Sequence, residues 1–240
     1  MFIIFDLDDT LLDTSATAGR FQLERAAQLL KTTLSPVESE ETIAQELIQA
    51  RPHHATGGET IFAICRRHQW PEEVALRAVD LYYHQHPPTL RVTMRGQAKE
   101  MLEELRRQRH RMALISIGRI EQQRRKMTQA GLDPAYFDYL EIVETADKSL
   151  AYRRVLEHWN LCPDQQQPQV VVVGDREETD LNPGRAMGMR LVLLGKGPHC
   201  QAIDARIQEL RELLPLLTKW EAEAAAKMHA HYGQDAVVEE

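Results

Sequence analysis

The hydrophobic residues of this chain follow two patterns. Short apolar runs, rich in β-branched side chains, occur at residues 1–5, 111–116, 139–143, 170–173 and 190–194. Runs of this length and composition predict buried strands. Between them apolar residues recur every three or four positions, as at Ala98, Met101, Leu102 and Leu105, which predicts amphipathic helices. The alternation predicts an α/β fold, with a Rossmann-like parallel sheet as the middle layer of an α/β/α core.

The stretch from 15 to 87 shows no strand pattern and predicts helices only. We expect helices at 18–31, from Pro36 behind an N-cap at Ser35, at 59–68, and at 71–83. Pro87 and Pro88 mark the return of the chain to the sheet. The predicted organisation is a core domain at 1–14 plus 88–217, an inserted all-helical domain at 15–87, and a C-terminal helix and tail at 218–240.

Four aspartates, Asp6, Asp8, Asp9 and Asp13, directly follow the first predicted strand. Carboxylates this close together raise one another's pKa and destabilise the fold unless a cation or hydrogen bonds neutralise them. Carboxylate oxygens, water and a substrate phosphate are the ligands typical of Mg²⁺. We therefore predict a Mg²⁺ site here, with an acidic helix-capping turn as the alternative.

A second acidic site follows the four valines at 170–173. Gly174 lets the chain turn, Asp175 comes at the carboxyl end of the strand, and Asp180 lies one turn further on. Open α/β sheets bind ligands at the carboxyl ends of their strands, so Asp175 is a candidate metal ligand. The alternative is an N-cap acid followed by a surface acid.

The pattern Asp6-x-Asp8-x-Thr10 behind an apolar strand resembles the first motif of the haloacid dehalogenase superfamily. Candidates for three further motifs follow in the family's order: Ser116 ending a strand, Lys148 near a helix start, and Gly174-Asp175 with Asp180 five positions on. Two residues depart from the usual motifs, since Ile117 replaces an Asn and Ser149 a Pro. The resemblance identifies the inserted helices as a cap that closes over the active site.

The resemblance implies a chemistry for three of these residues. Asp6 attacks phosphorus as the nucleophile and becomes an aspartyl-phosphate, and Asp8 acts as general acid and then as general base. Lys148 neutralises the charge of Asp6 and of the phosphoryl group.

The resemblance also implies the binding residues. The Ser116 hydroxyl and the backbone amide of Ile117 hold phosphoryl oxygens, and Thr10 is assigned to the same phosphate site. Mg²⁺ is bound by Asp6, the backbone carbonyl of Asp8, and Asp175. Asp180 either binds the metal through water or orients Lys148.

The loop at 51–58 contains Gly57 and Gly58, which allow the backbone to approach a ligand closely. We expect this loop to be the part of the helical cap that reaches the substrate, and a plain connection between helices is the alternative.

These residues favour a Mg²⁺-dependent phosphatase that acts on a small phosphate monoester. A 2-haloacid dehalogenase would use Asp6 but would need no acid such as Asp8, and a phosphomutase would need the same motifs. A non-catalytic binding protein would be expected to lose at least one of the acids. The substrate, the oligomeric state (monomer or homodimer) and the role of the C-terminal helix remain open.

Composition narrows the partners and the location. A hydrophobic content of 43% and a charged content of 27% are those of an ordinary globular protein. The net charge of −7 argues against nucleic acid or an anionic membrane as a partner. Three widely spaced cysteines, Cys65, Cys162 and Cys200, predict free thiols. With no targeting segment or transmembrane run in the sequence, we expect a cytoplasmic protein.

Overall fold

The computed structural model describes residues 1–54, 56–84, 91–195 and 202–235, and from 227 to 235 it describes the backbone alone. The predicted linker at Pro87 and Pro88 and the last five residues, 236–240, lie outside the described parts. Cys65 and Cys162 are free thiols, as predicted, and Cys200 lies outside the described parts. No helix among the described residues combines the length and the apolar content needed to cross a membrane.

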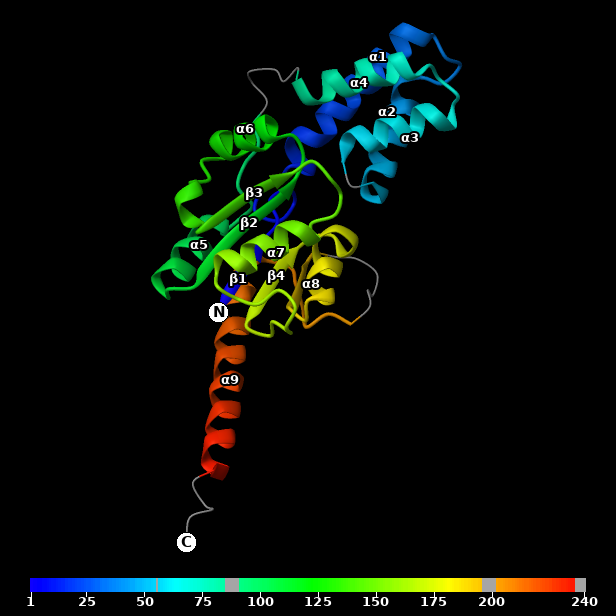
Figure 1. Cartoon of the computed structure of the whole chain (residues 1–240). Coiled ribbons are helices and arrows are strands. Elements are labelled where there is room, and N and C mark those ends of the chain that lie inside the picture. Colours follow the sequence, from blue (N-terminus) through cyan, green and yellow to red (C-terminus); the bar gives the residue numbers. More distant parts are fainter. Residues whose placement is uncertain (55, 85–90, 196–201, 236–240) are drawn as a thin grey trace.

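Six parallel strands form one sheet (Figure 1). They are β1 (Phe2–Phe5), β2 (Arg111–Ile117), β3 (Tyr139–Val143), β4 (Val170–Gly174), β5 (Arg190–Leu194) and β6 (Ala205–Ile207). Their order is β3-β2-β1-β4-β5-β6, and every pair is parallel. The predicted α/β class and Rossmann-like sheet are confirmed, and β6 is an edge strand that the sequence did not predict.

Helices cover both faces of the sheet. The core helices are α5 (Ala98–Arg107), α6 (Ile120–Ala130), α7 (Ser149–His158), α8 (Asn182–Ala186) and α9 (Leu213–Asp235). Successive side chains of β1 point to opposite faces, so Ile3 belongs to the cluster that includes α5 and the start of α9, whereas Ile4 belongs to the cluster that includes α7. Burial on both faces explains why β1 and β4 are continuously apolar.

The strand order creates a crevice between β1 and β4. From β1 the chain goes on to β2 and β3 on one side of the sheet, and only then crosses to β4, β5 and β6 on the other side. Phe5 pairs with Val173, so Asp6 and Asp175 leave neighbouring strands at the same edge. A reversal of strand order at this point is where open α/β sheets bind ligands.

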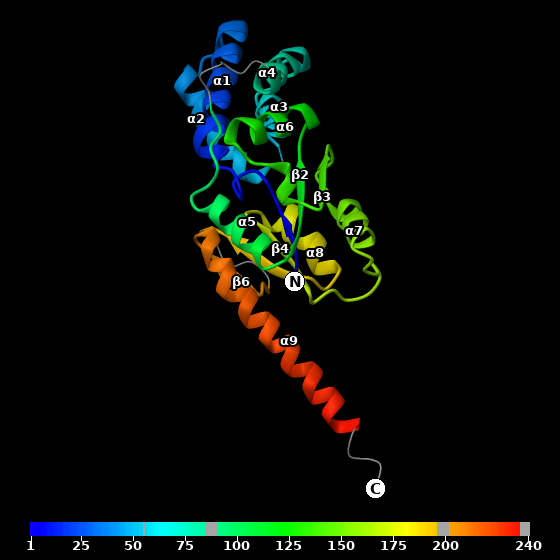
Figure 2. The same cartoon turned by 90° about the vertical axis from the view of Figure 1, so that its left-hand side faces the viewer.

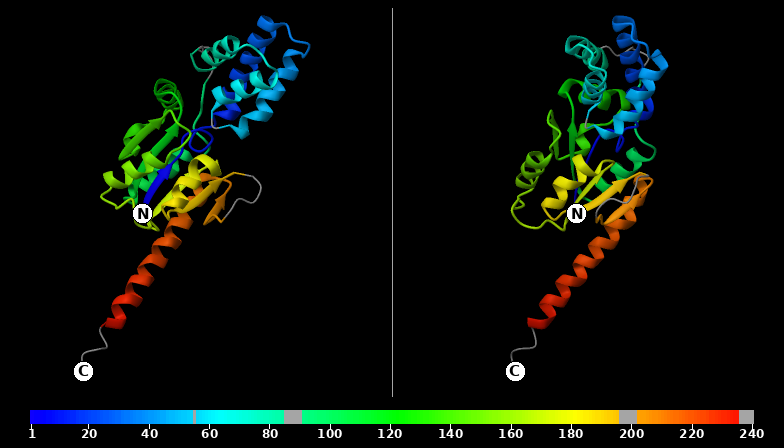
Figure 3. Two further views of the ribbon diagram at one scale, coloured as in Figure 1. Left: turned by 45° about the vertical axis from the view of Figure 1, so that its right-hand side comes forward. Right: turned by 90° about the vertical axis from the view of Figure 1, so that its right-hand side faces the viewer.

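The inserted segment is helical and has a hydrophobic core of its own. It contains the π-helical turn η1 (Ser15–Gly19), α1 (Arg20–Leu34), α2 (Glu40–Ala50), the 3-10 turn η2 (Arg51–His53), α3 (Gly57–Arg67) and α4 (Glu72–His84). Leu30, Ile43, Leu47, Ile61 and Ile64 are fully buried in its core. Figure 2 shows these helices gathered at one end of the molecule, with α9 extending from the other end, and Figure 3 shows the same arrangement from two further sides.

Several predicted boundaries were wrong. Ser35 ends α1 with a φ of 46°, and the N-cap of α2 is instead Ser39, whose hydroxyl accepts from the Thr42 amide at 3.2 Å. The helix predicted after residue 217 is part of a longer α9, which begins at Leu213 because the chain there already packs on the sheet.

Gly57 and Gly58 were predicted in a loop, but they form the first turn of α3 behind an N-cap at Thr56. A Cβ atom on Gly57 would lie 2.2 Å from the Tyr82 ring, and one on Gly58 would lie 3.0 Å from the Tyr83 ring. The Tyr83 hydroxyl also accepts from the Gly58 amide at 3.1 Å. The two glycines are therefore required by the close packing of α3 on the two tyrosines of α4.

Gly57→Ala is expected to lower the free energy of unfolding by about 1–3 kcal/mol, because the added methyl group must displace the buried Tyr82 ring. Gly96→Ala is the matched control, since a Cβ atom at Gly96 meets nothing within 4 Å. Urea unfolding of both variants measures the difference. Equal stability of the two variants would contradict this account of Gly57.

Candidate active site

A cavity of about 440 Å³ lies at the carboxyl ends of β1 and β4, between the sheet and the helical segment. From the core its wall includes Asp6, Asp8, Asp9, Asp175 and Asp180, and from the helical segment it includes Arg51, His53, Thr56, Gly57, Tyr82 and Tyr83. Ile117, Gly118, Gln122 and Lys126 complete one side. Asp6 and Asp175 belong to two acidic clusters and are 169 positions apart in the sequence, yet they line the same cavity.

Not every candidate residue reaches this cavity. Ser116, Lys148 and Gly58 are buried behind its wall. Thr10 is fully buried too, and its hydroxyl has no hydrogen-bond partner among the described residues. Thr10 therefore does not line the cavity, and its place in a phosphate site stays a prediction.

Lys148 is buried between two of the aspartates. It is the N-cap residue of α7 and has an exposed fraction of 0%. Its Nζ donates to Asp6 Oδ1 at 2.6 Å and to Asp180 Oδ1 at 2.7 Å. Asp180 Oδ2 accepts from the Arg176 amide at 3.0 Å, so both oxygens of Asp180 are occupied. This geometry is that of a residue that orients Lys148 and not of a direct metal ligand.

The carboxylates of Asp6 and Asp175 are left to face the cavity. Burial raises the pKa of Asp6 to about 7, although the nearby Lys148 opposes this shift. Burial also raises the pKa of Asp175 well above its ordinary value, and repulsion from Asp180 and Asp6 adds to the effect. No hydrogen-bond donor among the described residues bonds to the half-buried Asp175 carboxylate, and the charge of the neighbouring Arg176 opposes the rise in its pKa.

The donor set fits a hard divalent cation. Carboxylate oxygens of Asp6, Asp175 and Asp180 lie within 4.8 Å of one another, and no sulfur or imidazole ligand belongs to this group. Both oxygens of Asp180 bond to Lys148 or the Arg176 amide, whereas Asp6 bonds to Lys148 through Oδ1 alone, so Asp6 and Asp175 have more acceptor capacity left for an ion. Two carboxylates with the remaining positions open to water and a phosphate suit Mg²⁺.

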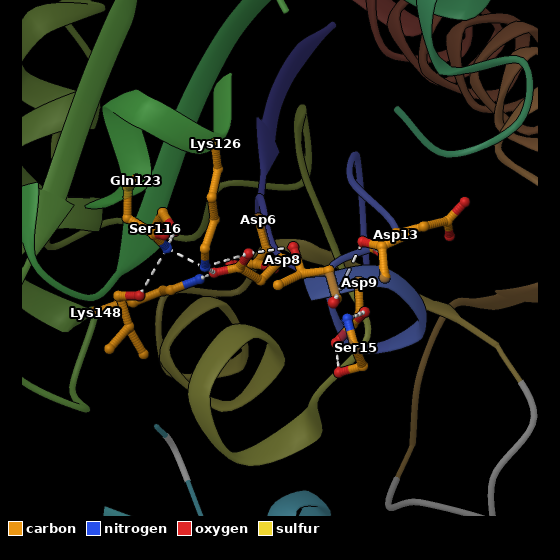
Figure 4. Close-up of polar contacts among 12 residues, drawn as sticks. Asp6, Asp8, Asp9, Asp13, Ser15, Ser116, Gln123, Lys126 and Lys148 are labelled. Atoms are coloured by element: carbon orange, nitrogen blue, oxygen red, sulfur yellow. Dashed lines mark hydrogen bonds and ion pairs between the residues drawn. The ribbon is translucent and has the colours of Figure 1, made fainter. Parts of the chain in front are cut away.

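Asp8 has a separate set of partners (Figure 4). The Thr14 hydroxyl donates to Oδ1 at 2.5 Å, the Gln123 amide to Oδ2 at 2.6 Å, and Lys126 Nζ lies 2.8 Å from each oxygen. Burial alone would raise the pKa of Asp8, but Lys126 and these hydrogen bonds together hold that pKa below its ordinary value. The two aspartates of the first motif therefore experience opposite environments.

Gln123 connects Asp8 to the end of β2. Its side chain is fully buried, and its Nε2 lies 2.7 Å from Ser116 Oγ and 2.9 Å from the Ile117 carbonyl (Figure 4). Nε2 carries two hydrogens, which these two oxygens and Asp8 Oδ2 share. A carboxamide thus lies beside the second motif even though the usual Asn is replaced by Ile117.

Sequence reasoning missed Gln123, Lys126 and Thr14. Gln123 and Lys126 are three residues apart and so lie on one face of α6, which is the face buried against the core with Met127. A polar pair at this spacing among core positions can indicate a buried polar site. In a helix with many charged residues, however, glutamine and lysine usually face solvent. No feature of the sequence pointed to Asp8 as their partner.

Two arginines next to the motif residues contact the helical segment. Arg176, which follows Asp175, donates to the Pro52 carbonyl at 2.9 Å. Arg119 lies 2.5 Å from His84 Nε2, and its guanidinium lies 5.1 Å from the centre of the Tyr83 ring. Both contacts hold the helical segment over the cavity.

Lys148→Met is expected to lower the free energy of unfolding in EDTA by about 3–5 kcal/mol, because it leaves Asp6 and Asp180 buried without their cation. Lys99→Met is the control, since Lys99 is exposed and lies 3.9 Å from Glu103 in a surface pair. Its loss is expected to change stability by less than about 1 kcal/mol. Thermal unfolding compares the two, and equal losses would contradict a buried ion network.

The effect of Mg²⁺ on stability is expected to depend on pH. The raised pKa values of Asp6 and Asp175 mean that, between about pH 4 and 7, the folded metal-free chain binds more protons than the unfolded chain. Its free energy of unfolding should therefore fall as the pH rises through this window. Because Mg²⁺ favours the ionised carboxylates, the increase in Tm on adding Mg²⁺ should be larger at about pH 8 than at about pH 5.

Thermal unfolding in EDTA and in Mg²⁺ at both pH values measures this difference. Asp175→Asn should reduce it, because one of the two carboxylates with raised pKa values is then replaced by a neutral amide. The same increase in Tm at both pH values would show that these acids do not bind the ion.

Comparisons with known proteins agree with this fold. The chain matches the haloacid dehalogenase-like hydrolases over residues 3–194, and no curated protein matches. A crystal structure of a predicted phosphoglycolate phosphatase from Haemophilus somnus is 18% identical with a TM-score of 0.67, over 90% of this chain and 96% of that one. A haloacid dehalogenase-like hydrolase from Xanthomonas campestris is 20% identical with a TM-score of 0.64, over 94% of this chain and 98% of that one.

A third similar structure is the HAD-hydrolase YfnB from Bacillus subtilis, which is bound to magnesium. It is 19% identical with a TM-score of 0.60, over 90% of this chain and 97% of that one. Since the similar structures also include a 2-haloacid dehalogenase from Pseudomonas syringae, they do not by themselves separate the activities of this fold. The match over 3–194, which includes both acidic motifs and the lysine between them, shows that the chain belongs to the haloacid dehalogenase-like hydrolases.

Proposed function

We propose that this hydrolase is a Mg²⁺-dependent phosphatase that cleaves a small phosphate monoester through an aspartyl-phosphate on Asp6. The observation that supports this most is that Asp6 and Asp8 line the same cavity and that each is paired with a different lysine. Lys148 is paired with Asp6 at 2.6 Å, and Lys126 is paired with Asp8 at 2.8 Å. A nucleophile and a separate proton-transfer group at one cavity are the two acids that this reaction requires.

In this mechanism Asp6 attacks phosphorus and Lys148 stabilises the charge of the nucleophile and of the phosphoryl oxygens. Asp6 and Asp175 would hold Mg²⁺ together with the backbone carbonyl of Asp8. The bound ion would neutralise the charge that develops on the phosphoryl oxygens. Asp180 keeps Lys148 in position through the 2.7 Å ion pair.

Asp8 carries the proton in both halves of the reaction. It donates a proton to the leaving oxygen, which requires that Asp8 be protonated against its lowered pKa, and it then accepts one from the water that hydrolyses the aspartyl-phosphate. Gln123 and Lys126 hold its carboxylate at the cavity wall. Ile117 lines the cavity, and its backbone amide is the proposed donor to the phosphoryl group, while Ser116 lies next to it and contacts Gln123 at 2.7 Å.

Asp8 also favours phosphoryl transfer over the related reactions. A dehalogenase releases a halide, which needs no proton, so three side chains devoted to holding an acid at this position would have no role. A phosphomutase would use the same residues and differs only in passing the phosphoryl group to a second hydroxyl. We place hydrolysis first because Asp8 can activate a water molecule from the open cavity.

Release of inorganic phosphate from a panel of small phosphate monoesters, with Mg²⁺ or with EDTA, tests the proposal. We expect Mg²⁺-dependent turnover, a loss of about 10⁴-fold or more in kcat for Asp6→Asn, and a loss of about 10²–10⁴-fold for Asp8→Asn. The Asp8→Asn loss should be smaller with p-nitrophenyl phosphate, whose leaving group needs little protonation.

Asp13→Asn is the matched control, since Asp13 belongs to the same acidic segment but does not line the cavity. It should retain turnover close to the unaltered protein. Halide release from 2-haloacids without phosphate release, or full activity of Asp6→Asn, would refute the proposal.

A further inference from the structure

A smaller cavity adjoins the catalytic one and differs from it in charge. It has a volume of about 130 Å³ and shares Asp8, Ser15, Arg51, Pro52, Tyr82 and Lys126 with the main cavity. Among the described residues that line this side cavity, Asp8 is the only acid, whereas Arg20, Arg51 and Lys126 are basic. The main cavity is dominated by acids, so the positive charge is concentrated on the side that lies beyond Asp8.

Arg51 is the basic residue of this cavity that lacks a carboxylate partner. Arg20 is largely exposed and is paired with Glu24 at 2.9 Å, and Lys126 is paired with Asp8. Arg51 is partly buried and donates to the His54 carbonyl at 2.8 Å, but among the described residues no carboxylate lies within ion-pair distance of it. A guanidinium held at a cavity wall in this way is stabilised by an anion that enters the cavity.

Two neighbours make Arg51 a defined site. The Tyr82 hydroxyl lies beside it, and burial raises the pKa of Tyr82 to about 12, so that hydroxyl stays a neutral donor. Lys126 has three N–H groups, and its contacts with the two Asp8 oxygens leave one of them for a ligand. The donors therefore come from both the helical segment and α6.

The position of Asp8 determines which part of the substrate reaches these donors. If Asp8 protonates the leaving oxygen, the leaving group must lie next to Asp8, on the side away from Asp6. Asp8 is also on the wall of the side cavity, so the leaving group extends toward Arg51. The cavity is small, which suits a compact anion.

We infer that the side cavity binds a carboxylate carried by the leaving group, so that the substrate class is a phosphorylated hydroxy acid. Arg51 is the specificity-determining residue, and Lys126 and Tyr82 are secondary donors. This inference rests on the proposed phosphatase function, because the phosphoryl group must occupy the Asp6 end of the cavity.

The test compares two substrates of similar size, 2-phosphoglycolate and ethylene glycol monophosphate. The first has a carboxylate where the second has a neutral hydroxymethyl group. The unaltered protein with Mg²⁺ should show a kcat/KM at least about tenfold higher for 2-phosphoglycolate, mainly through KM. Arg51→Gln should bring the ratio of the two values close to one. Arg77→Gln, which removes an exposed arginine of α4 that does not line either cavity, should keep the ratio.

A ratio close to one in the unaltered protein, or a ratio that survives Arg51→Gln, would overturn the inference while leaving the phosphatase proposal standing. Ethylene glycol bisphosphate serves as a third probe, and a preference for it over 2-phosphoglycolate would assign the site to a second phosphate and also overturn the inference.

Calorimetric binding of the same probes to Asp6→Asn protein in Mg²⁺ separates the two proposals. In Asp6→Asn, a lower Kd for 2-phosphoglycolate than for ethylene glycol monophosphate would support the carboxylate site, provided that the two Kd values become equal in Asp6→Asn/Arg51→Gln. This result would count even if the unaltered protein releases no phosphate. Equal binding of the carboxylate and neutral probes would overturn the inference.

Discussion

The ion network around Lys148 holds the active site together. Three segments meet there: Asp6 follows β1, Lys148 begins α7, and Asp180 lies in the turn after β4. Lys148 lies 2.6 Å from Asp6 and 2.7 Å from Asp180, and none of the three is appreciably exposed to water. Two buried carboxylates around one ammonium leave negative charge uncompensated, and Asp175 adds more. That excess charge is what a divalent cation would neutralise, so the network that stabilises this edge of the sheet also prepares it for a metal.

A second lysine gives the two aspartates of the first motif different properties. Lys126 and Gln123 reach Asp8 from α6, so the pKa of Asp8 is lowered, whereas burial raises the pKa of Asp6. The residues are only two positions apart in sequence, and the difference arises from the groups that surround each side chain.

The helical segment supplies the other half of the cavity, and it supplies charge of the opposite sign. The core contributes carboxylates, whereas the helical wall contributes Arg51 and the two tyrosines of α4. The same tyrosines pack on Gly57 and Gly58, so the groups that face a substrate are also part of the core of the helical segment. Arg119 and Arg176 then link this wall to the loops after β2 and β4.

The sequence by itself determined five of the six strands, the α/β class and the acidic motifs, because continuous apolar runs and clustered aspartates are local patterns that only a few structures accommodate. It also placed Asp175 at a strand end, since the carboxyl edge follows from a parallel sheet. Tertiary structure alone decided that Gln123 and Lys126 bind Asp8, more than 100 positions away, and that Thr10 is fully buried. It also decided that Gly57 and Gly58 begin a helix, because the space for a Cβ atom depends on where α4 packs. Contacts of this kind depend on helix placement over the sheet, and no local pattern of residues encodes that placement.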